Sequence, residues 1–141
     1  MLHDNFQMTG HLSIAINDAV VQEVHNLVVT DGKEFVASRM KDTTKAAMSH
    51  MAIGTGSTAA AAGDSALGSQ ADRNALTSTT VSGAAVTYVA TFAAGEGTGA
   101  ITEAGLFNAA SAGDMLCRTV FAVVNKGSSD SMTITWTVTV S

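Results

Sequence analysis

The end of the chain alternates strictly between apolar and hydroxyl side chains, and this pattern constrains the fold more than any other feature. Between Ser131 and Ser141, every second residue is apolar and the residues between them are serine or threonine. A period of two places the apolar row on one face of a β-sheet and the hydroxyl row on the other. Trp136 lies in the middle of the apolar row, so we expect it to anchor the core. The full row is Met132, Ile134, Trp136, Val138 and Val140.

Similar but weaker patterns predict seven more strands, most of them separated by residues that favour turns. The pair Asn17-Asp18 between the first two strands suits a tight hairpin, because both residues tolerate a positive φ. The glycine-rich segment from Gly95 to Gly99 reads as a flexible hairpin loop rather than a phosphate loop, since a strand follows it and not a helix. The expected strands are 11–16, 19–30, 48–53, 73–82, 85–94, 100–109 and 115–124, followed by 131–140.

One segment changes to helical periodicity. Phe35, Val36, Arg39 and Met40 have the spacing of one helix face. Thr30 or Asp31 is the expected N-cap, because Glu34 follows Asp31 by three residues as in a capping box. The pattern therefore predicts a single short helix that begins near residue 31 and ends near residue 43.

Taken together, these elements predict a mainly β protein. Several short strands at regular intervals indicate an antiparallel, jelly-roll-like β-sandwich of about eight strands with one short helix. We expect residues 10–141 to form a single domain, since 141 residues suffice for one core. Residues 1–9 are polar apart from Phe6 and Met8, so we expect an N-terminal arm whose two apolar side chains contact a neighbouring molecule.

The composition points to association with other chains. Only 13% of residues are charged, where about 25% is usual for soluble domains, while 46% are apolar. We therefore expect other chains to cover part of the surface; the alternative is a globule whose many alanines and glycines raise the apolar count. The net charge is −5 and the seven lysines and arginines are scattered, so nucleic acid is not an expected partner. Neither a signal peptide nor a membrane span is apparent, which favours synthesis in the cytoplasm.

The candidate chemical groups do not form a catalytic pattern. The four histidines, His3, His11, His25 and His50, lack the spacing of a metal site, and no carboxylate cluster accompanies them. Cys117 is the single cysteine and lies in an apolar run, where a buried inert thiol is expected. We therefore expect no enzyme activity, no cofactor and no metal.

Glu103 is the most informative charged residue, because it interrupts an apolar strand. We expect it to share a sheet face with Ile101, Gly105 and Phe107. An unpaired buried carboxylate is costly, so Glu103 should pair with a cation on a neighbouring strand, namely Arg118. The alternative is that Glu103 lies in a contact between chains.

Five segments, in this order along the chain, resemble a family of small virion proteins of tailed bacteriophages. The resemblance implies a virion structural protein without catalytic residues, namely a capsid cement or decoration protein. Such a protein would bind the major capsid protein as a homotrimer on the outer capsid surface. Independently of the resemblance, we expect the apolar Phe6 and Met8 of the arm to contact the shell or a neighbouring subunit. Related modules occur in tail fibres, collars and other appendages, which is the alternative role. The segments are Met48-Ser-His-Met-Ala-Ile-Gly-Thr-Gly56, Ala66-Leu-Gly68, Ile101-Thr-Glu-Ala-Gly-Leu-Phe-Asn108, Met115-Leu-Cys-Arg-Thr-Val-Phe121 and Thr133-Ile-Thr-Trp136.

Overall fold

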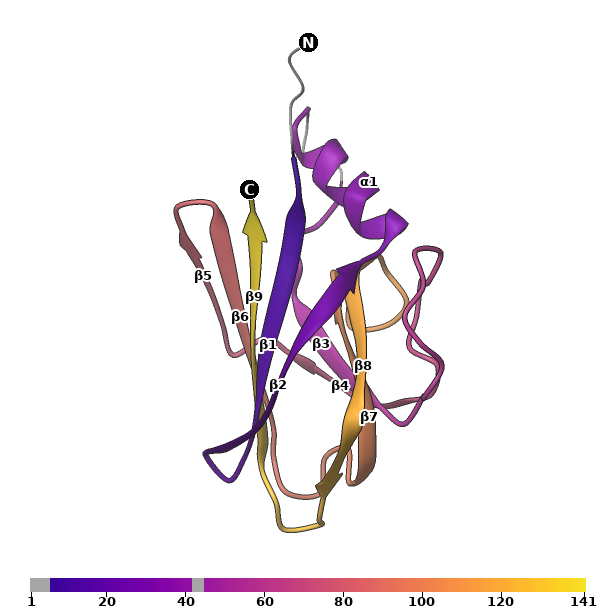
Figure 1. Cartoon of the computed structure of the whole chain (residues 1–141), viewed down its shortest axis with the longest axis vertical. Coiled ribbons are helices and arrows are strands. Elements are labelled where there is room, and N and C mark those ends of the chain that lie inside the picture. The colour runs from indigo at the N-terminus through magenta and orange to yellow at the C-terminus, as the bar shows by residue number, and fades with distance from the viewer. Residues whose placement is uncertain (1–5, 42–44) are drawn as a thin grey trace.

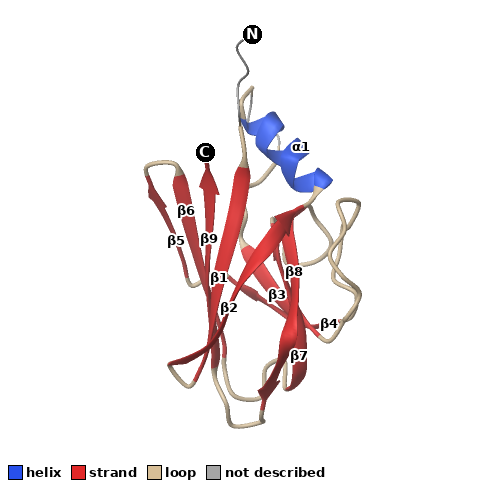
Figure 2. Cartoon of the chain, in the orientation of Figure 1, coloured by secondary structure: helices blue, strands red, loops and turns tan. Residues whose placement is uncertain are grey.

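A computed structural model describes residues 6–41 and 45–141, which contain nine strands and one helix (Figures 1 and 2). All strand pairs are antiparallel. The elements are β1 (Met8–Ile16), β2 (Ala19–Val28), α1 (Thr30–Arg39), β3 (His50–Gly54), β4 (Gln70–Ala75), β5 (Ser78–Ser82), β6 (Ala85–Phe92), β7 (Gly99–Phe107), β8 (Met115–Lys126) and β9 (Met132–Val140).

The nine strands form one sheet in the order β4-β3-β7-β8-β2-β1-β9-β6-β5. The sheet curls into two layers that share β2, with β5, β6, β9 and β1 on one side and β8, β7, β3 and β4 on the other (Figure 1). The two layers also approach each other on the side away from β2. There the Asn74 side chain on β4 donates a hydrogen bond to the Thr91 carbonyl on β6. The predicted antiparallel β-sandwich is therefore confirmed.

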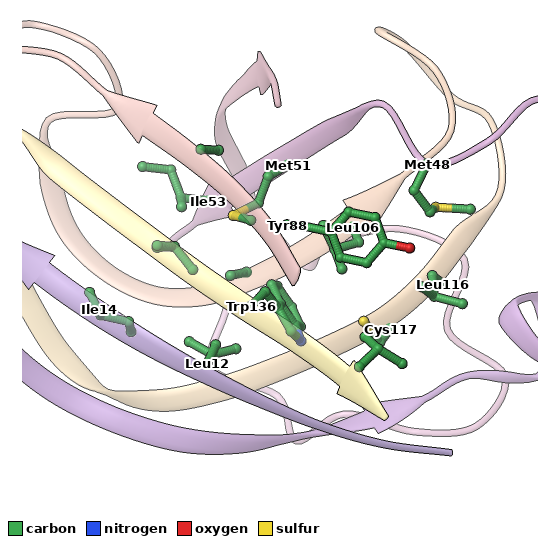
Figure 3. Packing of buried hydrophobic residues seen from close by; sticks show 14 of the residues in the cluster. Leu12, Ile14, Met48, Met51, Ile53, Tyr88, Leu106, Leu116, Cys117 and Trp136 are labelled. Carbon is green, nitrogen blue, oxygen red and sulfur yellow. The ribbon is translucent and has the colours of Figure 1, made fainter. Parts of the chain in front are cut away.

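Apolar side chains from both layers fill the space between them. Trp136 is completely buried, as the alternation on its strand predicts, and it lies among Leu12, Tyr88 and Leu106 (Figure 3). Its indole Nε1 donates to Asn26 Oδ1 at 2.7 Å, which supplies the partner that a buried N–H requires. The aromatic ring of Trp136 thus packs against β1, β6 and β7 while its N–H bonds to β2.

The segment expected as one strand over 73–82 is two strands in opposite layers. β4 pairs with β3, whereas β5 pairs with β6 at the other end of the sheet order. The chain changes layer at Leu76 and Thr77, whose N–H groups donate to Ser49 and Val89 respectively. Local alternation does not reveal such a crossover, because only two residues separate β4 from β5 and no glycine or proline marks the break. The split explains why the structure has nine strands where eight were expected.

Two expected turns have different outcomes. Asn17 and Asp18 have φ angles of 49° and 69°, which confirms the tight hairpin between β1 and β2. The segment from Gly95 to Gly99 joins β6 to β7, which lie in different layers and do not pair with each other. The expectation of a hairpin there is wrong, and the segment is instead a connection across the sandwich.

Helix α1 lies where the periodicity predicts a helix, but its ends differ from the expectation. Val29 occupies the N-cap and no side chain caps the helix, so the prediction of Thr30 or Asp31 as the cap is wrong. The helix ends at Arg39, while the expected end near residue 43 lies outside the described residues. Gly32 allows close packing on β8, since a Cβ there would lie 2.1 Å from the Leu116 carbonyl oxygen.

The expected boundary between arm and domain falls inside a strand. Met8 and Thr9 pair with Val140 and Thr139 as part of β1, and Gln7 exchanges two backbone hydrogen bonds with Ser141. Residues 7–9 therefore belong to the sandwich and not to an arm. Residues 1–5 lie outside the described residues.

Replacing Trp136 tests the central packing. We expect Trp136→Ala to lower the free energy of unfolding by about 3–5 kcal/mol, the range for removing a large buried aromatic side chain. Trp136→Phe should cost less but leave Asn26 Oδ1 without its donor. Urea unfolding followed by circular dichroism measures both variants, and an unchanged midpoint for Trp136→Ala would contradict the assignment.

Candidate functional site

The buried carboxylate of Glu103 on β7 is the most highly coordinated polar group in the described residues. It is inaccessible to solvent, and it accepts three backbone hydrogen bonds from a single loop. Gly56 N and Ser69 N donate to Oε2 at 2.6 and 2.7 Å, and Gly68 N donates to Oε1 at 2.8 Å. Three charge-assisted bonds of this length offset much of the cost of removing the carboxylate from water.

The guanidinium of Arg118 on the adjacent strand β8 completes the coordination. Its Nη2 and Nε donate to Glu103 Oε1 at 2.9 and 3.2 Å, which confirms the predicted ion pair. Arg118 also reaches outward, with Nη1 donating to Asp64 Oδ2 at 2.9 Å and Nη2 to the Thr58 carbonyl at 3.0 Å. The Arg118 side chain is only 3% exposed, so the ion pair with Glu103 is buried, whereas its outer partner Asp64 is 25% exposed and lies at the surface.

Residues 55–69 form an Ω-loop around this pair, with the loop ends joined by a hydrogen bond from Thr55 N to Ser69 O at 2.9 Å. The loop covers the outer face of the layer that contains β3, β7 and β8 (Figure 2). Its Leu67 packs on a small second core outside that layer, formed by Val29, Ala52, Phe107 and Met115. The loop is thereby held at both ends by its bonds to Glu103, near its second end by Leu67, and in its middle by the bonds from Arg118 to Thr58 and Asp64.

Glycines leave the room that the carboxylate needs. A Cβ on Gly56 would lie 2.3 Å from Glu103 Oε2, and one on Gly54 would lie 2.7 Å from the same atom. The spacing Gly54-Thr55-Gly56 is therefore explained by close approach of the backbone to Glu103, and not by a need for a positive φ.

The electrostatics favour the ionised form of Glu103 at neutral pH. Burial alone would raise the pKa of the carboxyl, but the N–H donors of Ser69, Gly68 and Gly56 together with Arg118 outweigh it and lower the pKa below its ordinary value. A carboxylate so held does not give up or take a proton near neutral pH. The arrangement is that of a structural anchor rather than a general acid or base.

The expected face of β7 is correct only in part. Phe107 shares the outer face with the Glu103 network, as its place in the second core shows. Ile101 instead lies in the core between the layers, because the β7–β8 register shifts between Ile101 and Glu103. A β-bulge of this kind leaves no pattern in the sequence that identifies it in advance.

The other candidate groups are dispersed. His11 and His25 lie opposite each other on β1 and β2, with ring centroids 5.5 Å apart, while His50 lies on β3 beside Ser49. His3 is outside the described residues. Within residues 6–41 and 45–141, no three histidine, cysteine or acidic side chains are grouped as metal ligands. Cys117 is buried in the main core, as expected, and burial raises the pKa of its thiol.

Phe6 and Met8, the two expected contact residues, lie at the same end of the molecule but differ in exposure. Phe6 is 65% exposed, whereas Met8 packs partly against the core. Both line a surface hollow of about 430 Å³ between the start of β1 and helix α1, which contributes Lys33 and Val36. Adjoining hollows share His25 and Leu27 and extend to Ala59 and Ala60 of the Ω-loop. The sequence does not predict this groove, because its walls come from distant segments.

Comparison with known proteins identifies no relative: no family model, no curated protein and no solved structure matches the chain significantly. In the part of the chain that the structure describes, no helix has the length and apolar character needed to cross a bilayer.

Two glycines in the Ω-loop offer a matched test of the buried anchor. We expect Gly56→Ala to loosen the loop, because the new methyl group would occupy the position of the Glu103 carboxylate. Gly63→Ala should be harmless, since a Cβ there meets nothing within 4 Å. Limited proteolysis, with cleavage sites mapped by mass spectrometry, should show faster cutting within 57–67 for Gly56→Ala alone. Equal rates for the two variants would refute the anchor.

The ion pair has a predictable pH dependence. Because the folded state lowers the pKa of Glu103, its contribution is fully present above the ordinary carboxyl pKa and is lost as the pH falls through the folded value. We expect Glu103→Gln to cost about 3 kcal/mol at neutral pH, near the lower limit for breaking a buried pair, since Asp64 still neutralises Arg118.

This cost should shrink progressively below about pH 4.5, the ordinary carboxyl value. Urea unfolding from pH 7 to pH 3 measures the difference between wild type and variant. The exposed Glu23→Gln is the control and should show no such trend. A cost for Glu103→Gln that stays constant with pH would contradict the assignment.

Proposed function

We propose that this chain is a structural protein of a tailed-bacteriophage virion, a cement or decoration protein that binds the outer capsid surface as a homotrimer. One observation carries the proposal. Four of the five segments that resemble such proteins contribute directly to the Glu103 network, through Gly56, Gly68, Glu103 and Arg118. These four segments are far apart in the sequence but meet at the buried carboxylate of Glu103. This supports the interpretation that the resemblance reflects a shared structural core.

The surface of the sandwich suits repeated weak contacts. Charged residues are few, and large apolar side chains are exposed at several separate places on the molecule. Contacts that are weak singly become strong when several copies are joined in one trimer, because binding of one subunit holds the other two close to their own sites on the shell. The exposed side chains are Phe6, Val20, Val21, Leu27, Met40, Val81 and Val123.

Stabilisation of the shell would follow from mass action. A protein that binds the assembled shell more tightly than the separate subunits shifts the equilibrium towards the shell. The groove beside the Ω-loop offers a preformed surface for this, since the Glu103–Arg118 network fixes one of its walls before binding. The major capsid protein is the proposed partner, and the host cytoplasm is the proposed place of synthesis.

The abundance of the chain in purified virions tests the proposal. Quantitative gel densitometry against the major capsid protein should give hundreds of copies per particle. A few to tens of copies would instead support the alternative role as a tail fibre, collar or other appendage module. Absence from the virion would overturn both roles.

Shell binding should depend on Phe6. Because Phe6 is 65% exposed, Phe6→Ser should leave the unfolding midpoint unchanged but reduce co-sedimentation with expanded shells. Glu23→Gln is the control and should bind as wild type does, because Glu23 is exposed but is not one of the apolar side chains proposed to make contacts. Equal binding by wild type and Phe6→Ser would remove Phe6 from the contact surface while leaving the copy-number test unaffected.

A further inference from the structure

The two edges of the sheet are protected very differently against pairing with another chain. The edge strand β4 carries Asp72 and Arg73. The Arg73 guanidinium lies 3.7 Å from the centroid of the Phe107 ring and donates to the carbonyls of Ala109 and Ala112. Charged side chains of this kind commonly prevent unwanted pairing at sheet edges.

The opposite edge, β5, has none of these features. Its sequence Ser-Thr-Thr-Val-Ser contains no charge and no proline, and all five residues are exposed. The Val81 side chain is 71% exposed, although its strand partner Val86 packs against the core. Among the described residues, β5 pairs with β6 alone, so one row of its backbone groups is open. An uncharged open edge with an exposed valine is a template for a further strand.

The hairpin geometry identifies which backbone groups are open. Gly83 and Ala84 alone connect β5 to β6, and Gly83 has a φ of 57°, as the first central residue of a type II′ turn requires. In a two-residue hairpin the residues that flank the turn, here Ser82 and Ala85, bond to each other, and bonded pairs then alternate. Thr80 therefore directs its backbone groups towards β6, whereas Thr79 and Val81 direct theirs to the open edge.

We propose that β5 pairs antiparallel with β5 of a second copy of this chain, about a twofold axis at Thr80. In this register Thr79 lies opposite Val81 of the second copy, so the two open residues on each strand face each other. The pairing forms four N–H···O bonds and joins the two sheets into one. Thr80 lies opposite its own counterpart at a position whose backbone groups already bond to β6.

Side-chain placement supports a second copy as the occupant. Thr79 and Val81 lie opposite Tyr88 and Val86, so their side chains project on the core side of the sheet. The twofold register places each exposed Val81 beside Thr79 of the partner strand. Both side chains then lie on the core side of the joined sheet, where they cover each other from solvent. No charge on β5 repels its own copy, and none selects a partner of opposite charge.

This contact does not rest on the proposed virion role. A twofold contact is isologous and closes on itself. It is compatible with a homotrimer, because copies in adjacent trimers can meet at twofold axes. Its failure would leave the copy-number test of the virion role unaffected, and the reverse also holds.

Sedimentation equilibrium of the full chain with three variants tests the proposal. Val81→Lys places a charge on the open edge, and Thr79→Pro removes one open N–H without affecting the bonds to β6. Ala75→Lys places the same charge on the exposed end of β4 as the control. With increasing concentration, the average mass of wild type and Ala75→Lys should rise to at least twice that of Val81→Lys and Thr79→Pro, which cannot form the contact between β5 strands.

Hydrogen exchange provides a second readout that does not depend on mass. The amides of Thr79 and Val81 should exchange more slowly in concentrated than in dilute wild type, and at the fast rate in Val81→Lys at both concentrations. Thermal unfolding by circular dichroism verifies that each variant is folded. Equal masses for folded wild type and Val81→Lys, or fast exchange at both amides in concentrated wild type, would overturn the proposal.

Discussion

A single buried carboxylate organises one side of the molecule. Glu103 lies on a strand in the middle of one layer, where desolvation would expel an unpaired charge. Its ligands are three backbone N–H groups of the Ω-loop and the guanidinium of Arg118, which itself binds Asp64 and Thr58 of the same loop. The carboxylate therefore fixes the conformation of the loop. In turn, the N–H groups of the loop replace the water molecules that would otherwise hydrogen-bond to the carboxylate.

This mutual dependence explains which parts of the site the sequence could predict. A single acidic residue in an apolar strand requires a cation, which predicts Arg118 as the partner. The structure confirms it, because Arg118 lies on the adjacent strand opposite Gly105, two residues from Glu103. The sequence does not indicate which three N–H groups bind the carboxylate, since every residue except proline has a backbone N–H. The glycines at positions 54 and 56 become informative only once the carboxylate beside them is known.

The fold shows the same division between local pattern and long-range geometry. The alternation around Trp136 and the turn at Asn17-Asp18 follow from local preferences, and both are confirmed. The crossover at Leu76 and Thr77 and the bulge before Glu103 depend on which strands lie nearby in space. Extended backbone is compatible with either layer, so pattern alone could not assign β4 and β5 to opposite edges of the sheet.

The pairing of Gln7 with Ser141 has a mechanical consequence. These residues lie next to each other at one end of the sandwich, on antiparallel strands β1 and β9 (Figure 1). Tension that separates them acts across the strands, so their hydrogen bonds break one after another instead of sharing the force. Tension along the strand direction, applied between the Val140 end of β9 and the Ile16 end of β1, would load many of those bonds together. A lower force should therefore unfold the sandwich when the strands are peeled apart from this end than when they are sheared along their length. The direction of the applied force determines the unfolding force.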